Sequence, residues 1–145
     1  ALDLKDAKKT LDNLAQLFKW EVTDSKETQL ANTDFKYTIH RFGPEAVLLS
    51  TPDNKVLAFA MAKLDADSIR QRMAGLGVKP EAQMERLLNR APSPVDKVFV
   101  ETKDFGLILS GHRIGQDEKK PDKPQYDLFL IYNHDFYKAM VKDFE

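Results

Sequence analysis

Two of the three histidines in the chain stand in segments that resemble each other. Each segment begins Asp-Phe, continues through residues typical of a strand, and ends His-Arg-apolar-Gly, once over 34–43 and once over 104–115. Imidazole is the side chain whose proton equilibrium lies nearest to neutral pH. The two histidines of this repeat, His40 and His112, are therefore the residues best suited to acid–base chemistry.

A pair of histidines can hydrolyse a phosphodiester or a related ester when both rings converge on one cleft. One imidazole acts as the acid and the other as the base, while Arg41 and Arg113 would stabilise the developing negative charge. Two-histidine phosphoesterases usually carry Thr or Ser two residues after each histidine, and here Phe42 and Ile114 occupy those positions. Hydrolysis is thus the alternative hypothesis for the repeat.

Strand periodicity predicts which side of a strand each repeated residue occupies. Side chains alternate between the two faces, so Arg41 shares a face with Tyr37 and Ile39, and His40 lies on the opposite, more polar face. The spacing from Phe to His differs by two residues between the copies, which preserves this phase. A strand-ending role explains the motif without chemistry, since arginine can cover the core edge and glycine can turn the chain. Duplication of a helix-plus-three-strand unit would explain it equally.

The remaining composition argues against several kinds of catalytic site. Without cysteine, the chain forms neither a disulfide nor a thiolate metal site. It contains no Gly-x-Ser-x-Gly, no Gly-x-x-x-x-Gly-Lys and no pair of histidines at metal-ligand spacing. We therefore expect neither a cofactor nor a bound metal.

Charge and hydropathy bear on the partner. The chain has 22 basic and 23 acidic residues, a balance that disfavours nucleic acid as the main partner. No apolar run is long enough for a membrane span. Ala1 can follow either methionine removal or signal-peptide cleavage, and between these we lean towards an exported protein.

Hydrophobic periodicity predicts four helices and six strands. Apolar residues at three- and four-residue spacing indicate the helices, which are expected over 4–19, 67–75, 81–90 and from 134 onward. Short apolar segments between turn residues indicate strands over 35–42, 45–51, 55–63, 97–101, 105–114 and 126–132. The polar segment 21–33 is expected to be a loop with at most a short strand.

These elements predict an α+β fold in one domain, 1–145, with a possible internal boundary near 91–95. Tight turns such as Gly43-Pro44 join antiparallel neighbours, and no strand-helix-strand alternation appears. The sheet is therefore expected to be mainly antiparallel, in the order helix, three strands, two helices, three strands, helix. We expect the helices to pack on one face of this sheet.

By elimination, the sequence predicts a small non-enzymatic bacterial module that binds another protein. The element order is similar to that of secretion chaperones, which would dimerise through the central helices. It is also similar to that of inhibitor or immunity proteins, which more often use a protruding loop. Tyr126 and Tyr132, at strand ends, are expected partner contacts. Expected contacts in the charged loop 116–125 are Lys119, Lys120, Asp122 and Lys123.

Overall fold

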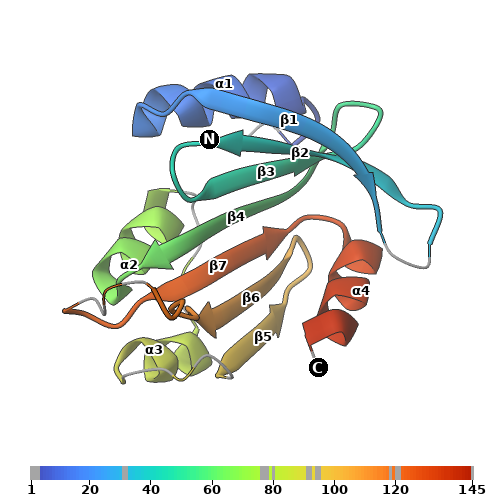
Figure 1. Cartoon of the computed structure of the whole chain (residues 1–145). Coiled ribbons are helices and arrows are strands. Elements are labelled where there is room, and N and C mark those ends of the chain that lie inside the picture. Colours follow the sequence, from blue (N-terminus) through green and yellow to red (C-terminus); the bar gives the residue numbers. More distant parts are fainter. Residues whose placement is uncertain are drawn as a thin grey trace.

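A computed structural model describes residues 4–30, 33–75, 79, 81–90, 93, 96–117, 119 and 122–144 of the chain. This part contains four helices and seven strands (Figure 1). The helices are α1 (Ala7–Phe18), α2 (Ala66–Gly75), α3 (Ala82–Leu88) and α4 (His134–Phe144). The strands are β1 (Val22–Gln29), β2 (Lys36–Phe42), β3 (Ala46–Ser50), β4 (Val56–Leu64), β5 (Lys97–Glu101), β6 (Gly106–Gly111) and β7 (Tyr126–Ile131).

All seven strands form one antiparallel sheet in the order β1-β2-β3-β4-β7-β6-β5. The pairing of β4 with β7 joins the two halves of the chain at the centre of this sheet. The predicted α+β class with an antiparallel sheet is therefore confirmed, as is the predicted order of elements apart from β1. Of the predicted boundary at 91–95, only Ser93 lies within the described residues.

Strand β1 lies where at most a short strand was expected. It pairs with β2 along its length, from Val22 opposite Phe42 to Gln29 opposite Lys36. Nearly all of its residues are exposed, because it forms one edge of the sheet and buries neither face. A strand of this kind needs no apolar alternation, so its polar sequence lacks the pattern by which a strand is predicted.

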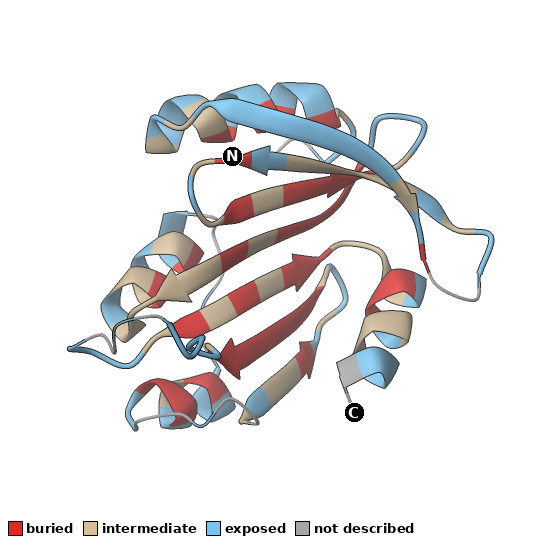
Figure 2. Ribbon diagram, in the orientation of Figure 1, coloured by how far each residue is buried: buried red, intermediate tan, exposed pale blue. Residues whose placement is uncertain are grey.

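The two faces of the sheet bury separate apolar clusters. Helices α1, α2 and α3 cover one face, where Leu14, Ile69 and Met84 pack against strand residues such as Phe59. We call this the three-helix face. Helix α4 covers part of the opposite face, and we call that the α4 face. The central strands are the most deeply buried, as Figure 2 shows by their red segments.

The position of α4 corrects the expectation that all helices share one face. Phe136 of α4 packs against the rings of Phe35 and Tyr37, at centroid distances of 5.6 and 5.4 Å. Tyr137 lies so close to Gly106 that a Cβ there would stand 2.1 Å from its ring. Strand β4 and its neighbours are apolar on both faces, so the second face also needs a helix to cover it. Figure 1 places α4 at one end of β6 and β7, and α2 and α3 at the other end.

The turn between β2 and β3 is fixed by a glycine and a tryptophan. Gly43 has a positive φ of 68°, a conformation that glycine adopts without steric cost. A Cβ at this position would stand 2.4 Å from the indole of Trp20, so the ring packs directly on the glycine backbone. Trp20 follows Lys19, the residue that caps the C-terminus of α1 and adopts the left-handed conformation. This contact ties the end of α1 to the turn.

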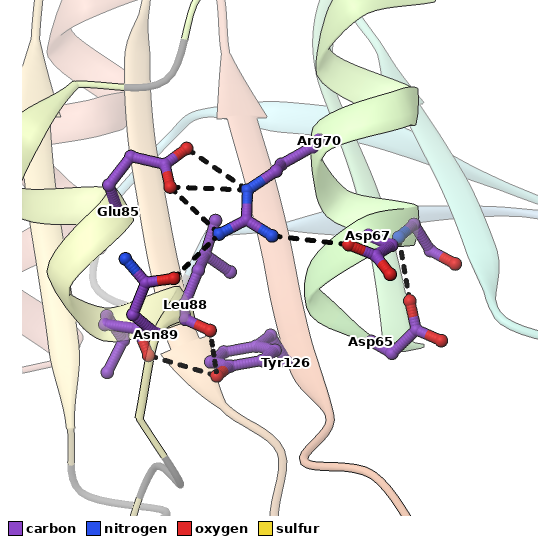
Figure 3. A network of polar contacts seen from close by, with 9 residues as sticks. Asp65, Asp67, Arg70, Glu85, Leu88, Asn89 and Tyr126 are labelled. Atoms are coloured by element: carbon purple, nitrogen blue, oxygen red, sulfur yellow. Dashed lines mark hydrogen bonds and ion pairs between the residues drawn. The ribbon is translucent and has the colours of Figure 1, made fainter.

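A polar network joins α2 to α3 (Figure 3). The guanidinium of Arg70 donates to both carboxylate oxygens of Glu85, with the shortest distance 2.9 Å, and also to Asn89. The Arg70 guanidinium holds the pKa of the Glu85 carboxyl below its usual range. Beneath them, the hydroxyl oxygen of Tyr126 lies 3.0 Å from the carbonyl oxygen of Leu87 and 2.8 Å from that of Arg90, so the two carbonyls share its single proton. The last carbonyls of α3 therefore find their donor on β7.

Candidate functional site

His40 lies between two serine hydroxyls. Its Nδ1 is 2.8 Å from the hydroxyl of Ser25 on β1, and its Nε2 is 2.8 Å from that of Ser50 on β3. Partial burial lowers the pKa of His40 below its ordinary value of 6.5. Both ring nitrogens are thus engaged within the sheet.

His112 follows the last residue of β6 and is held by a carboxylate. Its Nδ1 lies 2.8 Å from Oδ1 of Asp127 on β7, and its side chain is only 14% exposed. Its Nε2 is buried and has no hydrogen-bond partner among the described residues. The ring nitrogen that does not face Asp127 is therefore shielded from solvent.

The structure does not bring the two histidines together. His40 stands opposite Leu48, which belongs to the core of the three-helix face. His112 has the phase of Ile108, which belongs to the α4 face. Four strand spacings, about 19 Å, also separate β2 from β6. The pairing that the hydrolase alternative requires is absent from this arrangement.

The two arginines of the repeat occupy different environments. Arg41 lies within β2 and shares a face with Tyr37 and Ile39, as its phase predicts. Arg113 lies beyond β6, which ends at Gly111 rather than continuing to Ile114 as expected, and it is exposed. The two arginines therefore do not form a common anion site.

The arrangement of the sheet also bears on the duplication hypothesis. Because β4 and β7 are central and antiparallel, a two-fold axis between them would exchange β3 with β6 and β2 with β5. The repeated segments, however, lie in β2 and β6. The sequence repeat therefore does not follow the approximate symmetry of the sheet.

The predicted partner contacts lie in different environments. Tyr126 is fully buried and lies under α3, so it is not part of any exposed surface. Tyr132 packs on the core beside Phe105, and burial raises its pKa to about 12. In the charged loop, exposed side chains are found at Lys119, Asp122 and Lys123, whereas Lys120 lies outside the described residues.

A groove on the α4 face was not predicted from the sequence. It has a volume of about 600 Å³ and lies over the part of that face that α4 leaves open. Its floor is a row of side chains that are neighbours across four strands. The row consists of Val47, Ala60, Phe129 and Ile108. We call this feature the alanine groove, because Ala60 and Ala62 of β4 line its centre.

Charged residues form the rim of the alanine groove. Nζ of Lys63 pairs with Glu45 at 3.6 Å, and the backbone N–H of Lys63 donates to Asp127. Lys63 stands at a bulge between β4 and β7, with a positive φ of 57°. Bulges of this kind re-aim side chains beside functional sites. Asp127 also holds His112, so its carboxylate is already engaged.

Arg41 is the exception on this rim. It is exposed and lies next to Val47 in the strand register, at the β2 end of the groove. Asp24 stands opposite Arg41 on β1, but no ion pair joins the two side chains. Among the described residues, the Arg41 guanidinium has no hydrogen-bond or ion-pair partner.

A sequence signal for the groove exists in β4. Alanine recurs at every second residue, at Ala58, Ala60 and Ala62, which places all three on one face of the strand. Ala58 lies in the apolar cluster that α4 covers, and the next two alanines line the groove. The run 56–62 by itself predicts only a buried strand, because periodicity does not distinguish a covered face from an open one.

Within the described residues, no cluster of three or more potential ligand side chains could hold a metal ion. No helix in this part of the chain is long and apolar enough to cross a bilayer. Comparison of the chain with protein-family models, curated proteins and solved structures gave no match.

Proposed function

We propose that this chain is a protein-binding module without catalytic activity of its own, and that it holds its partner in the alanine groove. An inhibitor or a secretion chaperone would be a module of this kind. The observation that carries the proposal is the groove of about 600 Å³ on an apolar sheet face that α4 covers only in part. Exposed apolar surface that is rimmed by polar residues is typical of sites where a protein binds a partner.

The histidines favour binding over hydrolysis. His40 uses both ring nitrogens within the sheet, and Nε2 of His112 is buried. Neither ring lies among the residues that line the groove. The alanine groove and the groups best suited to acid–base chemistry therefore lie in different places.

A selection from a displayed peptide library tests the proposal. We expect the intact chain to enrich peptides whose binding is weakened more than about tenfold by Ala60→Arg, because this change puts an unpaired charge on the groove floor. Ala74→Arg is the matched control, since Ala74 is exposed on α2, at the other face of the sheet. Both variants are first checked for the thermal unfolding midpoint of the wild type. Enrichment of no peptide, or peptides that bind the Ala60→Arg variant as well as the wild type, would contradict the proposal.

A further inference from the structure

We infer that the occupant of the alanine groove is an amphipathic helix of a partner protein, which lies beside α4 and turns an acidic residue toward Arg41. This inference rests on the proposed function and specifies the form and chemistry of the partner segment.

The strands under the groove already use their backbone N–H and C=O groups within the sheet, so these groups are not available to a partner segment. The floor row comes from β3, β4, β7 and β6, and each of these strands is hydrogen-bonded to a neighbour on both sides. An extended segment lying on this face would leave its own N–H and C=O groups unpaired above apolar side chains, which is costly. Extended peptides instead add to sheet edges. A helix satisfies its backbone internally, so it is the form of chain that fits this face.

The same face already binds one helix. Val47 and Phe129 pack against the apolar cluster that α4 covers, and both also line the groove. The apolar surface therefore continues without a break from beneath α4 into the groove. From Val47 to Ile108 the floor spans three strand spacings, about 14 Å, which corresponds to about ten residues of helix.

The helices of the described chain already pack their apolar side chains against the sheet. The buried stripe of α1 includes Leu11 and Leu14, and that of α2 consists of Ile69 and Met73. Buried residues of α3 and α4 likewise belong to the two cores. A second copy of the described chain could offer one of these stripes only by unpacking it. The occupant is therefore assigned to a different protein.

The rim indicates the charge of the partner helix. Glu45 and Asp127 already have partners, whereas the guanidinium of Arg41 has none among the described residues. Guanidinium groups bind carboxylates through paired hydrogen bonds. An Asp or Glu at the edge of the apolar stripe would reach Arg41 at the β2 end of the groove.

Labelled peptides of about fourteen residues and identical composition test the inference by fluorescence anisotropy. The first peptide carries leucines at helical spacing and one Glu beside the stripe. The second has the same residues in alternating order, as in a strand, and the third has them scrambled. We expect only the helical peptide to bind the wild type. Its affinity should fall more than about tenfold in the Ala60→Arg variant and should be unchanged in the Ala74→Arg variant.

The other outcomes identify other occupants. Preferential binding of the alternating peptide would overturn the helix assignment while the proposed function survived. If no peptide bound and Ala60→Arg abolished a concentration-dependent dimer, the occupant would be a second copy and the inference would fail. Binding of dodecanoate in place of every peptide would overturn both the inference and the proposed function.

A charge exchange tests the role of Arg41 separately. We expect Arg41→Glu to weaken the Glu-bearing helical peptide about threefold, in the range of partly exposed charge pairs. A peptide with Lys in place of that Glu should bind the Arg41→Glu variant with the affinity that the Glu-bearing peptide has for the wild type. Equal binding of both peptides to wild type and variant would show that Arg41 does not contribute to peptide recognition.

Discussion

His40 lies within β2 and has a hydrogen-bonding neighbour at each of its two ring nitrogens. Its imidazole is held by Ser25 and Ser50, from the strands on either side of β2. Partial burial lowers its pKa below 6.5, so the folded protein binds a proton there less readily than the unfolded chain. The contribution of His40 to stability is therefore complete above about pH 6.5 and is lost as the pH falls below it.

We expect the wild type to lose more of its free energy of unfolding than a His40→Gln variant between about pH 7 and about pH 5. His134→Gln is the matched control, because the contribution of His134 to the free energy of unfolding changes with pH in the opposite direction. Glu101 and the carbonyl of Lys103 raise the pKa of His134, so its contribution is complete at low pH and is lost as the pH rises. Urea titrations across this pH range measure how the free energy of unfolding of the wild type and of each variant changes with pH. Identical slopes for wild type and His40→Gln would contradict the assignment.

Gly43 is the second residue whose role can be measured alone. Gly43→Ala should lower the free energy of unfolding by about 2 kcal/mol or more, because it combines a left-handed backbone with a clash against Trp20. Gly75→Ala is the control, since an added Cβ there meets no atom within 4 Å. In a helix this exchange is neutral or gains up to about 1 kcal/mol. Equal effects at both glycines would show that the indole does not pack on the Gly43 backbone.

At the scale of elements, Tyr126 attaches α3 to the sheet. Tyr126→Phe should cost about 1–2 kcal/mol, because the carbonyls that end α3 lose a buried donor. The control is Tyr132→Phe, which removes a hydroxyl that has no hydrogen-bond partner among the described residues. We expect this control to change the unfolding free energy by less than about 0.5 kcal/mol. A cost at Tyr132 as large as that at Tyr126 would refute the hydrogen-bonding explanation.

The elements themselves were predictable to the extent that they bury an apolar pattern. Helix α4 was expected from its stripe, but the stripe contains no information on which of two apolar sheet faces it covers. Strand β1 was missed because its side chains are polar on both faces. The same limit applies to the repeat. Periodicity groups Ser110 with His112, but cross-strand register decides which face of the sheet the group occupies.

At the scale of the whole molecule, the sheet should be most stable at its centre. We expect amide hydrogen exchange to be slowest in β4 and β7, which are paired on both sides and deeply buried, and fastest in β1. Exchange measured by mass spectrometry on the intact chain resolves these strands. Protection of β1 equal to that of β7 would mean that another molecule covers this edge.

The candidate site also depends on the whole sheet, and for that reason it could not be predicted from the sequence. Val47, Phe129 and Ile108 come from three strands in both halves of the chain, and only the pairing of β4 with β7 makes them one floor. The alternating alanines of β4 were visible in the sequence. Whether a helix covers them is decided by the length and position of α4, which no local pattern specifies.

The outer strands limit how molecules of this kind can join. Open strand edges are the templates on which separate sheets fuse into fibres, and charged side chains along an edge oppose that fusion. Strand β1 exposes Asp24, Lys26 and Glu27, and β5 is bounded by Lys97 and Glu101. The sheet is thereby hindered from lengthening into a ribbon of many copies, so the chain can keep an apolar face open while its edges resist polymerisation.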